Sequence, residues 1–136
     1  MELTEQQKEA IGKSTFTNHN HMDLETLEPD YVVFRLDIRP ESMNPYGTVH
    51  GGALYTLADD AAGVAVHTDG RSYVTQAGSL SFLENQSSGT VRAAGRVLRR
   101  GRSTAFVDVK ITGEHGRLLA SGSFIFHVIE KPVSDC

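Results

Sequence analysis

One stretch of the chain, residues 51–67, constrains the fold more than any other. Its apolar residues recur with the spacing of a helix face, and they are Ala53, Leu54, Leu57, Ala58, Ala61, Ala62, Val64 and Ala65. The remaining stripe holds Thr56, Asp59, Asp60 and Gly63 at i, i+3, i+4 and i+7 spacing. The pattern predicts one long helix from Gly51 to about His67, and its richness in alanine and leucine indicates that other structure encloses it.

The other strongly patterned segments predict strands. Residues 31–38 alternate, with Val32, Phe34, Leu36 and Ile38 on one face. After the turn at Asp69-Gly70, four strand-like runs follow, at residues 72–83, 90–98, 103–112 and 117–129. Short segments that contain glycine separate these runs and are typical of hairpin connections, which predicts a four-strand meander. One apolar helix against an antiparallel sheet is an α+β domain, with the helix wrapped by the concave face of the sheet.

The chain ends carry weaker signals. Thr4-Glu5-Gln6-Gln7 predicts a capping box that starts a short amphipathic helix, which runs to about Ser14. The mixed polarity of residues 16–30 predicts a loop, with room for a turn of helix. The 136 residues fit one domain. We therefore expect a single domain over residues 1–136, with an N-terminal helix and loop at 1–30 and a polar tail at 131–136.

Composition excludes several classes of function. The formal net charge of -4 argues against non-specific nucleic-acid binding. The N-terminus lacks the basic and apolar regions of a signal peptide, and no apolar run approaches the ~18 residues of a membrane span. The single cysteine, Cys136, leaves no intrachain disulfide. We therefore expect a cytoplasmic protein with no nucleic-acid or membrane partner, and no metal site, because His19 and His21 lack further ligands at a known spacing.

The loop that leads into the long helix, from Asn44 to Gly52, has the character of a ligand site. A helix N-terminus presents unpaired N–H groups and a partial positive charge, and the glycines Gly51 and Gly52 let an oxygen approach them closely. Such a site can bind the oxyanion of acyl transfer, with donors added or oriented by Asn44 and His50. The same residues also fit a tight loop-to-helix turn that binds nothing.

Asp59 adds a geometric constraint. A carboxylate on a mostly apolar helix is costly without partners, although a solvated helix face is the alternative for Asp59 and Asp60. Gly51 and Asp59 are eight residues apart, about 12 Å along a helix. Asp59 therefore cannot act on an atom held by the Gly51 amide of its own chain. If both residues are catalytic, the site lies between two antiparallel copies of the helix, and we expect at least a homodimer.

The run of Asn44, then His50-Gly51-Gly52, then Thr56-Leu57-Ala58-Asp59 resembles the hotdog-fold acyl-CoA thioesterases. The similarity is to their PaaI-like group, which is associated with phenylacetate degradation, and it covers roughly residues 31–129. It implies a hotdog fold, in which one long central helix is wrapped by a five- to six-stranded antiparallel sheet. It also implies a dimer of dimers, with no cofactor other than the coenzyme A of the substrate.

The resemblance implies roles for the site residues. The Gly51 amide, with Asn44, polarises the thioester carbonyl, and His50 helps to hold Asn44 and the loop. Asp59 of the facing subunit is the general base or the nucleophile, a choice that the family leaves open. Thr75 matches a family Ser/Thr that positions the water; taken alone, it also fits an ordinary outward strand residue.

A basic turn between the strand-like runs at 90–98 and 103–112 is the candidate for the CoA end. Arg99, Arg100 and Arg102 surround Gly101, with Ser103 and Thr104 following. Arginine suits phosphate oxygens, although a solvated basic hairpin has the same composition. The resemblance places CoA contacts along this turn and at further positions, which are Gly52, Leu83, Glu84, Asn85 and His127.

The expected activity is hydrolysis of an aryl- or acyl-CoA thioester to the free acid and CoA. Two alternatives remain on the same fold, since fold alone does not decide function. One is a non-catalytic acyl-CoA sensor, which would need no base such as Asp59. The other is a hydratase or dehydratase that pairs His50 with Asp59.

Overall fold

The computed structural model describes residues 1–130, so the expected tail at 131–136, with Cys136, lies outside the described part of the chain. The helices and strands follow in the order α1 (Glu5–Gly12), α2 (Thr15–His19), β1 (Met22–Glu28), β2 (Tyr31–Asp37), α3 (Gly51–Val66), β3 (Ser72–Phe82), β4 (Thr90–Arg100), β5 (Thr104–Thr112) and β6 (Leu118–Ile129). Short 3-10 turns occur at Pro40–Ser42, His67–Asp69 and Glu114–Gly116.

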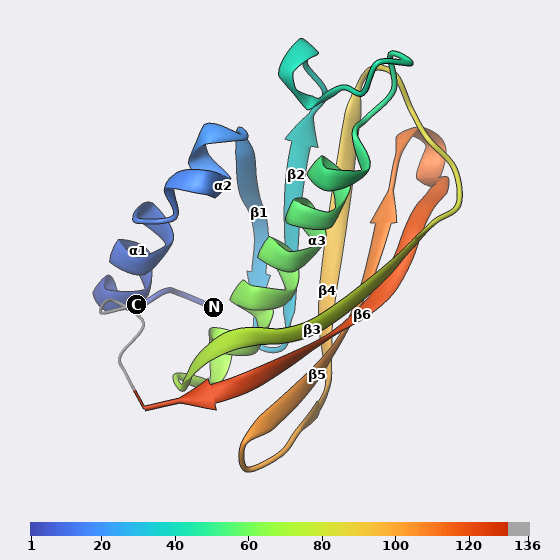
Figure 1. Cartoon of the computed structure of the whole chain (residues 1–136). Helices are drawn as coiled ribbons and strands as arrows, with labels where there is room; N and C mark the ends of the chain where they lie inside the picture. The colour runs from blue at the N-terminus through green and yellow to red at the C-terminus, as the bar shows by residue number, and fades with distance from the viewer. Residues whose placement is uncertain (131–136) are drawn as a thin grey trace.

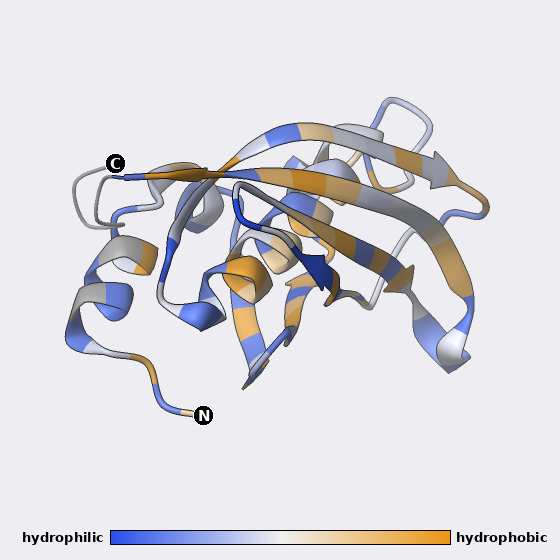
Figure 2. Ribbon diagram, turned by 90° about the horizontal axis from the view of Figure 1, so that it is seen from below, coloured by the Kyte–Doolittle hydropathy of each residue, from blue (hydrophilic) through white to orange (hydrophobic). Residues whose placement is uncertain are grey.

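The six strands form one antiparallel sheet in the order β1-β2-β4-β5-β6-β3, and the sheet curls around α3 (Figure 1). The buried face of α3 consists of Leu54, Leu57, Ala58, Ala61, Ala62, Ala65 and Val66. Figure 2 shows apolar residues along the strands that surround this helix. The prediction of an α+β domain with an enclosed long helix is confirmed.

The approach of the sheet to α3 is close at β4. A Cβ atom on Gly95 would lie 2.9 Å from the carbonyl carbon and oxygen of Ala61. Glycine and alanine at this crossing let the helix backbone rest directly on the strand. Ala61 is one of the small helix residues that predicted an enclosed helix. Together with Gly95 it determines how closely the sheet packs on α3.

The expectation of a loop at residues 16–30 was wrong for the edge strand β1, whereas the turn of helix that it allowed is present as α2. In β1 the pairing register shifts between Leu24 and Thr26, which marks a bulge. The bulge breaks the alternation of apolar and polar residues on which strand prediction depends. Met22 is the only fully buried residue of this strand, so the strand needs few apolar residues and its sequence shows little alternation.

The expected four-strand meander was wrong at its first connection. β3 pairs with β6 instead of β4. The segment 83–89, which connects β3 to β4, crosses the end of the sheet (Figure 1). Gln86 holds this crossing in place, because its buried side chain donates to the carbonyls of Ser88 and Thr90 and accepts from the N–H of Glu114. The β4–β5 and β5–β6 connections do pair antiparallel neighbours, as expected.

The N-terminal segment starts with the predicted capping box. Gln7 N–H donates to Thr4 Oγ1 (3.1 Å), and Thr4 N–H donates to Gln7 Oε1 (2.9 Å). Two hydrogen bonds then tie the segment to α3 and the turn that follows it, from Gln7 Nε2 to the His67 carbonyl (3.3 Å) and from Thr17 Oγ1 to Asp60 Oδ1 (3.0 Å). Within residues 1–130, no helix has both the length and the apolar character that crossing a membrane requires.

Candidate active site

The N-terminus of α3 leaves one amide open. His50 is the N-cap, and its Nδ1 accepts the N–H of Gly52 at 2.8 Å. The N–H of Ala53 donates to the His50 carbonyl. The Gly51 N–H forms no hydrogen bond to any described residue, so it is the amide that can meet a substrate oxygen. His50 also contacts the preceding loop, because its N–H donates to the Ser42 carbonyl at 2.8 Å, whereas its side chain caps the helix and forms no hydrogen bond with Asn44 in the described chain.

Asn44 is held by its own loop. Its Oδ1 accepts the N–H groups of Tyr46 (2.9 Å) and Thr48 (3.2 Å), and its Nδ2 donates to Thr48 Oγ1 (2.9 Å). Asn85 supports the same loop, because its Nδ2 donates to Thr48 Oγ1 and to the Val49 carbonyl, both at 3.1 Å. A primary amide has two N–H donors, so Asn44 keeps one for a ligand.

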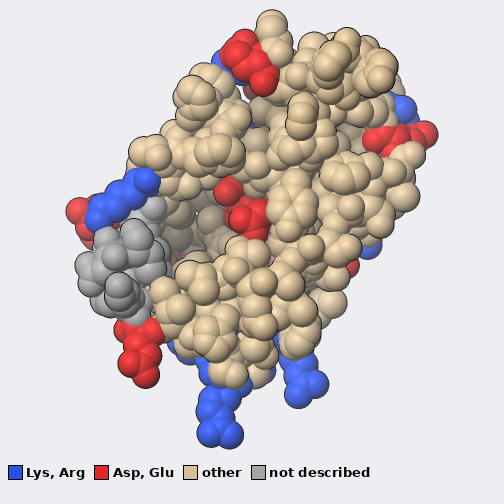
Figure 3. Space-filling view, viewed as in Figure 1, with Lys and Arg blue, Asp and Glu red and all other residues tan. Residues whose placement is uncertain are grey.

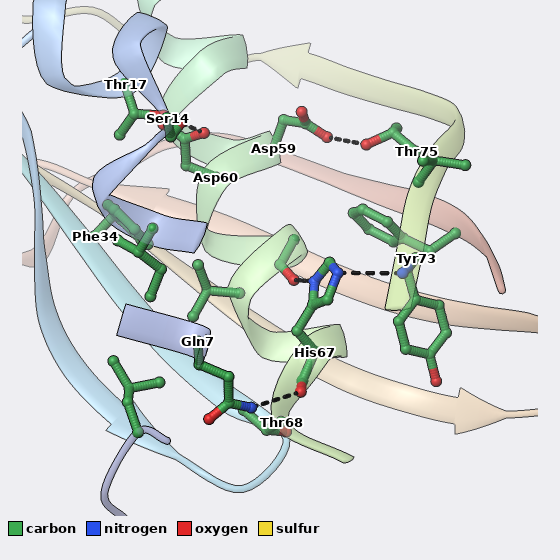
Figure 4. Close-up of a pocket in the computed structure, with 16 residues that line it drawn as sticks. Gln7, Ser14, Thr17, Phe34, Asp59, Asp60, His67, Thr68, Tyr73 and Thr75 are labelled. Carbon is green, nitrogen blue, oxygen red and sulfur yellow. Dashed lines mark hydrogen bonds between the residues drawn. The ribbon is translucent and has the colours of Figure 1, made fainter. Parts of the chain in front are cut away.

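Asp59 lies between α3 and β3, where the structure brings it together with Thr75. Thr75 Oγ1 donates to Asp59 Oδ1 at 2.8 Å (Figure 4). Burial raises the pKa of the Asp59 carboxyl above its ordinary value, and the Thr75 hydrogen bond offsets part of that rise. The pair is a carboxylate poised to take a proton, with a hydroxyl fixed beside it.

Asp60 points toward α2, away from Thr75 (Figure 4). Its Oδ1 accepts a hydrogen bond from Thr17 Oγ1. The Thr17 hydroxyl is also hydrogen-bonded to the Ser14 hydroxyl, at 2.7 Å. Its Oδ2 is buried and has no partner in the described part of the chain. Burial, helped by the charge of Asp59, raises the pKa of the Asp60 carboxyl to about 7, against the lowering effect of the Thr17 hydrogen bond. The sequence assigned Asp60 no role, and only the docking of α2 reveals its surroundings.

A cavity of about 310 Å³ opens beside the two aspartates, between the N-terminal segment, α3 and β3. Figure 3 shows acidic atoms beside a hollow near the middle of this face, while the other charged side chains lie around its edge. The lining residues are Leu3, Gln7, Ile11, Ser14, Thr17, Phe34, Asp59, Asp60, Gly63, Val64, His67, Thr68, Tyr73, Val74, Thr75 and Phe126. The cavity is therefore largely apolar, with its carboxyl groups on one side.

His67 closes the far end of this cavity, and the fold uses both of its ring nitrogens. Nδ1 lies 2.6 Å from the Gly63 carbonyl, and Nε2 accepts the N–H of Tyr73 at 3.1 Å. These partners require the neutral ring with its proton on Nδ1. Burial lowers the pKa of His67 in agreement with that state. His67 therefore links α3 to β3 and is not a free base.

Arg100, expected at the CoA end, requires a correction. Its guanidinium donates to the carbonyls of Val66 (2.9 Å) and Ala65 (3.3 Å) at the C-terminus of α3. It also forms ion pairs with Asp30 (2.7 Å) and Asp69 (2.9 Å). The guanidinium stabilises the end of the helix, so Arg100 has no donors to spare for a phosphate.

The other CoA candidates form two groups at opposite ends of the sheet. The first group is at the β4–β5 turn and comprises Arg99, Gly101, Arg102, Ser103 and Thr104, with the exposed His127 paired opposite Thr104. The second group lies beside the N-terminus of α3 and comprises Gly52, Leu83, Glu84 and Asn85. The two ends are about 30 Å apart along β3, so the groups do not converge within one chain.

Comparison with known proteins agrees with this architecture. The model of the thioesterase superfamily matches residues 46–120. Acyl-coenzyme A thioesterase PaaI of Escherichia coli (strain K12) is 26% identical over 100 residues, which cover 73% of this chain and 71% of that protein. The solved structure of the E. coli PaaI protein shares the fold, with a TM-score of 0.85 over 92% of this chain and 96% of that chain at 22% identity.

A solved structure with a bound molecule is also similar. The hypothetical thioesterase from Streptococcus pneumoniae TIGR4, solved with coenzyme A, is 28% identical, with a TM-score of 0.81 over 90% of this chain and 95% of that chain. The family model spans more than half of the sequence, and the wrapped helix and sheet are those of the hotdog fold. This chain therefore belongs to the thioesterase superfamily, as a PaaI-like thioesterase of the hotdog fold.

Proposed function

We propose that this protein hydrolyses the thioester bond of an acyl- or aryl-CoA, releasing the free acid and CoA, in a site that two copies of the chain share. The observation that carries the proposal is the hydrogen bond of 2.8 Å between Thr75 and the half-buried Asp59. Burial raises the pKa of this carboxyl, which makes it a stronger proton acceptor than a surface aspartate. Asp59 and Thr75 are 16 residues apart, the same separation as between the Asp and the Thr replaced by alanine in two structures of the S. pneumoniae thioesterase.

The open Gly51 amide supplies the second half of the site. It lies about 12 Å along α3 from Asp59, too far to serve one carbonyl group within a single chain. In a symmetric dimer with antiparallel α3 helices, Asp59 of one copy faces Gly51 of the other. Each dimer then has two complete sites.

The exposed edge of the sheet supports such a dimer. β3 is an edge strand that pairs only with β6 in the described chain. Val74 and Phe82 on this strand and Leu83 beyond it are exposed large apolar side chains. A long, apolar, unpaired edge strand is suited to pairing with another copy. Pairing of β3 with its antiparallel counterpart would also place the two α3 helices side by side.

The reaction follows from these positions. The Gly51 N–H and the free Asn44 N–H stabilise the negative charge that develops on the thioester oxygen. Asp59 takes a proton from the water that attacks the carbonyl carbon, while the Thr75 hydroxyl holds that water. The carbon–sulfur bond then breaks, and the CoA thiolate leaves and takes up a proton. Direct attack by Asp59, with later hydrolysis of an anhydride, uses the same groups.

The separated CoA candidates also fit a shared site. Two antiparallel copies bring the β4–β5 turn of one copy toward the 44–52 loop of the other. The thioester of a bound acyl-CoA would lie at Gly51 of one copy. Arg99 and Arg102 of the other copy would then contact the phosphate oxygens of the same CoA. His127 would line the same path. Replacement of Arg102 by alanine should raise KM with little change in kcat.

Release of CoA from a panel of short-chain, medium-chain, long-chain and aryl thioesters tests the activity. Gly51→Pro is the sharpest variant for the oxyanion site. Gly51 is the first residue of α3, where proline is tolerated, and His50 has the extended backbone that proline requires of its predecessor. The variant removes only the amide donor and should lower kcat by about 10²–10³-fold. Gly51→Ala, which keeps the N–H, is the matched control and should retain most of the activity.

Mixing two inactive variants tests whether the site is shared. Asp59→Ala and Gly51→Pro chains that exchange subunits should form mixed dimers in which one site keeps both native residues. Activity should return to about a quarter of the wild-type value per chain at a 1:1 ratio. A site confined to one chain would give no recovery in a mixture that mass spectrometry shows to be fully exchanged. Trace activity of the wild type with every thioester would instead indicate a sensing role.

A further inference from the structure

The cavity beside Asp59 runs along one face of α3. Asp59, Gly63 and His67 are spaced four residues apart, so they line one side of the helix over about 12 Å. The rest of the wall includes six large apolar side chains, which are Leu3, Ile11, Phe34, Val64, Val74 and Phe126. The cavity therefore begins at the proposed catalytic pair and leads away from it into an apolar space.

Gly63 has no structural reason to be glycine. Glycine is the least favourable residue in a helix interior apart from proline. Among the described residues, a Cβ atom at Gly63 would meet only a ring carbon of Phe126 at 3.9 Å, which is an ordinary contact. The backbone at this position is α-helical and needs no left-handed conformation. The missing side chain leaves open the middle of the cavity, between Asp59 and His67.

The N-terminal segment forms the wall opposite α3. Ile11 of α1 lines the cavity from this side, and two anchors hold the segment in place. One is the hydrogen bond from Gln7 to the His67 carbonyl, and the other is that from Thr17 to Asp60. Both anchors sit at the cavity itself, so the position of this wall and the width of the cavity are set together.

We propose that this cavity receives the acyl group of the thioester and that Gly63 sets the size of the group that fits. The inference rests on the proposed thioesterase function, because a thioester carbonyl at Asp59 directs its acyl carbons toward Gly63. The volume of about 310 Å³ is roughly twice that of a ~150 Å³ cavity known to hold benzene. The acyl group is therefore an apolar aryl group or a medium-length chain.

Side chains of increasing size at Gly63 of α3 fill the cavity in steps and test whether it receives the acyl group. The variants Gly63→Ala and Gly63→Leu are assayed with acetyl-, octanoyl- and benzoyl-CoA. Gly63→Leu should lose kcat/KM for the octanoyl and benzoyl thioesters by at least about tenfold relative to acetyl-CoA, since a pocket discriminates by roughly 10–200-fold per methylene. Gly63→Ala should lie between Gly63→Leu and the wild type. Gly12→Ala is the control, because a Cβ there meets no atom within 4 Å and Gly12 does not line the cavity.

Variants of the opposite wall keep the test decisive if Gly63→Leu does not fold. Ile11→Trp should shift the preference toward acetyl-CoA in the same way, and Ile11→Ala should shift it toward longer chains. Unchanged preference in folded Gly63 and Ile11 variants would overturn the assignment, as would an equal loss with all three thioesters. A wild type that hydrolyses none of the thioesters would overturn the proposed function itself. Hydrolysis with a chain-length preference that Gly63 variants leave unchanged would overturn only the assignment of the cavity.

Discussion

Asp60→Asn should change how the stability of this protein depends on pH. Asp60 is held under α2, and its pKa is raised from 3.8 to about 7. Among residues 1–130, Asp59 is the only charged group that contributes to this shift; α2 and its N-cap present the hydroxyls of Thr17 and Ser14, and β2 presents Phe34. Between these two pKa values the folded chain keeps a proton that the unfolded chain has lost. Stability therefore falls as pH rises through this window.

The size of the effect follows from the shift. Each pKa unit corresponds to about 1.36 kcal/mol, so the wild type loses about 2–3 kcal/mol of unfolding free energy through Asp60 between pH 5 and pH 8. Asparagine keeps the oxygen that accepts from Thr17 but does not titrate. Its NH₂ replaces the unpartnered Oδ2 and costs about 1–3 kcal/mol at every pH. Asp60→Asn should therefore be less stable than the wild type at pH 5, and most or all of this difference should be gone at pH 8.

Urea unfolding at pH 5, 6, 7 and 8, with both proteins at one concentration, measures this difference. The gap between variant and wild type should shift by about 2–3 kcal/mol in favour of the variant from pH 5 to pH 8. Asp23→Asn, at an exposed position on β1, is the control and should run parallel to the wild type. Parallel curves for Asp60→Asn and the wild type would refute the buried, protonated carboxyl.

Three further outcomes follow from the contacts described above. Arg100→Ala should lower the unfolding free energy by about 2–4 kcal/mol in denaturant titrations, because charged hydrogen bonds to the end of α3 are lost. The KM for acyl-CoA should stay unchanged in this variant. Gly95→Ala should cost about 1–3 kcal/mol in the same titrations by pushing β4 from Ala61. Thr75→Val removes a hydrogen bond that lowers the pKa of Asp59, so the acid limb of the kcat/KM profile should move to higher pH.

The parts of the fold that the sequence predicted are those determined by local pattern. α3 is long and strongly periodic, and the strands β4 to β6 follow one another through short turns, so each neighbour is also the pairing partner. β3 is different, because its partner is chosen by a crossing that Gln86 stabilises through contacts with residues near 90 and 114. β1 was missed because a bulge between Leu24 and Thr26 erases its period.

The candidate site divides in the same way. The distance between Gly51 and Asp59 is fixed by helix geometry, so the sequence alone predicts that the two residues of one chain cannot serve the same carbonyl group, which is the basis of the proposed shared site. Which amide is open depends on the side chain of His50, which occupies the N–H of Gly52. The commitment of Arg100 to the end of α3 is likewise a contact between distant segments. Residue type and spacing do not encode such contacts.

Asp59 and Asp60 show why position decides what a carboxyl does. They are neighbours in sequence, and the ~100° turn between successive helix residues directs one toward β3 and the other toward α2. Asp59 must carry a charge to accept a proton from water, and a second charge beside it would oppose that ionisation. Because burial under α2 raises the pKa of Asp60 to about 7, Asp60 keeps its proton below that pH and adds no charge beside Asp59. The docking of α2 therefore lets two adjacent aspartates line one cavity without a second negative charge from Asp60 at mildly acidic pH.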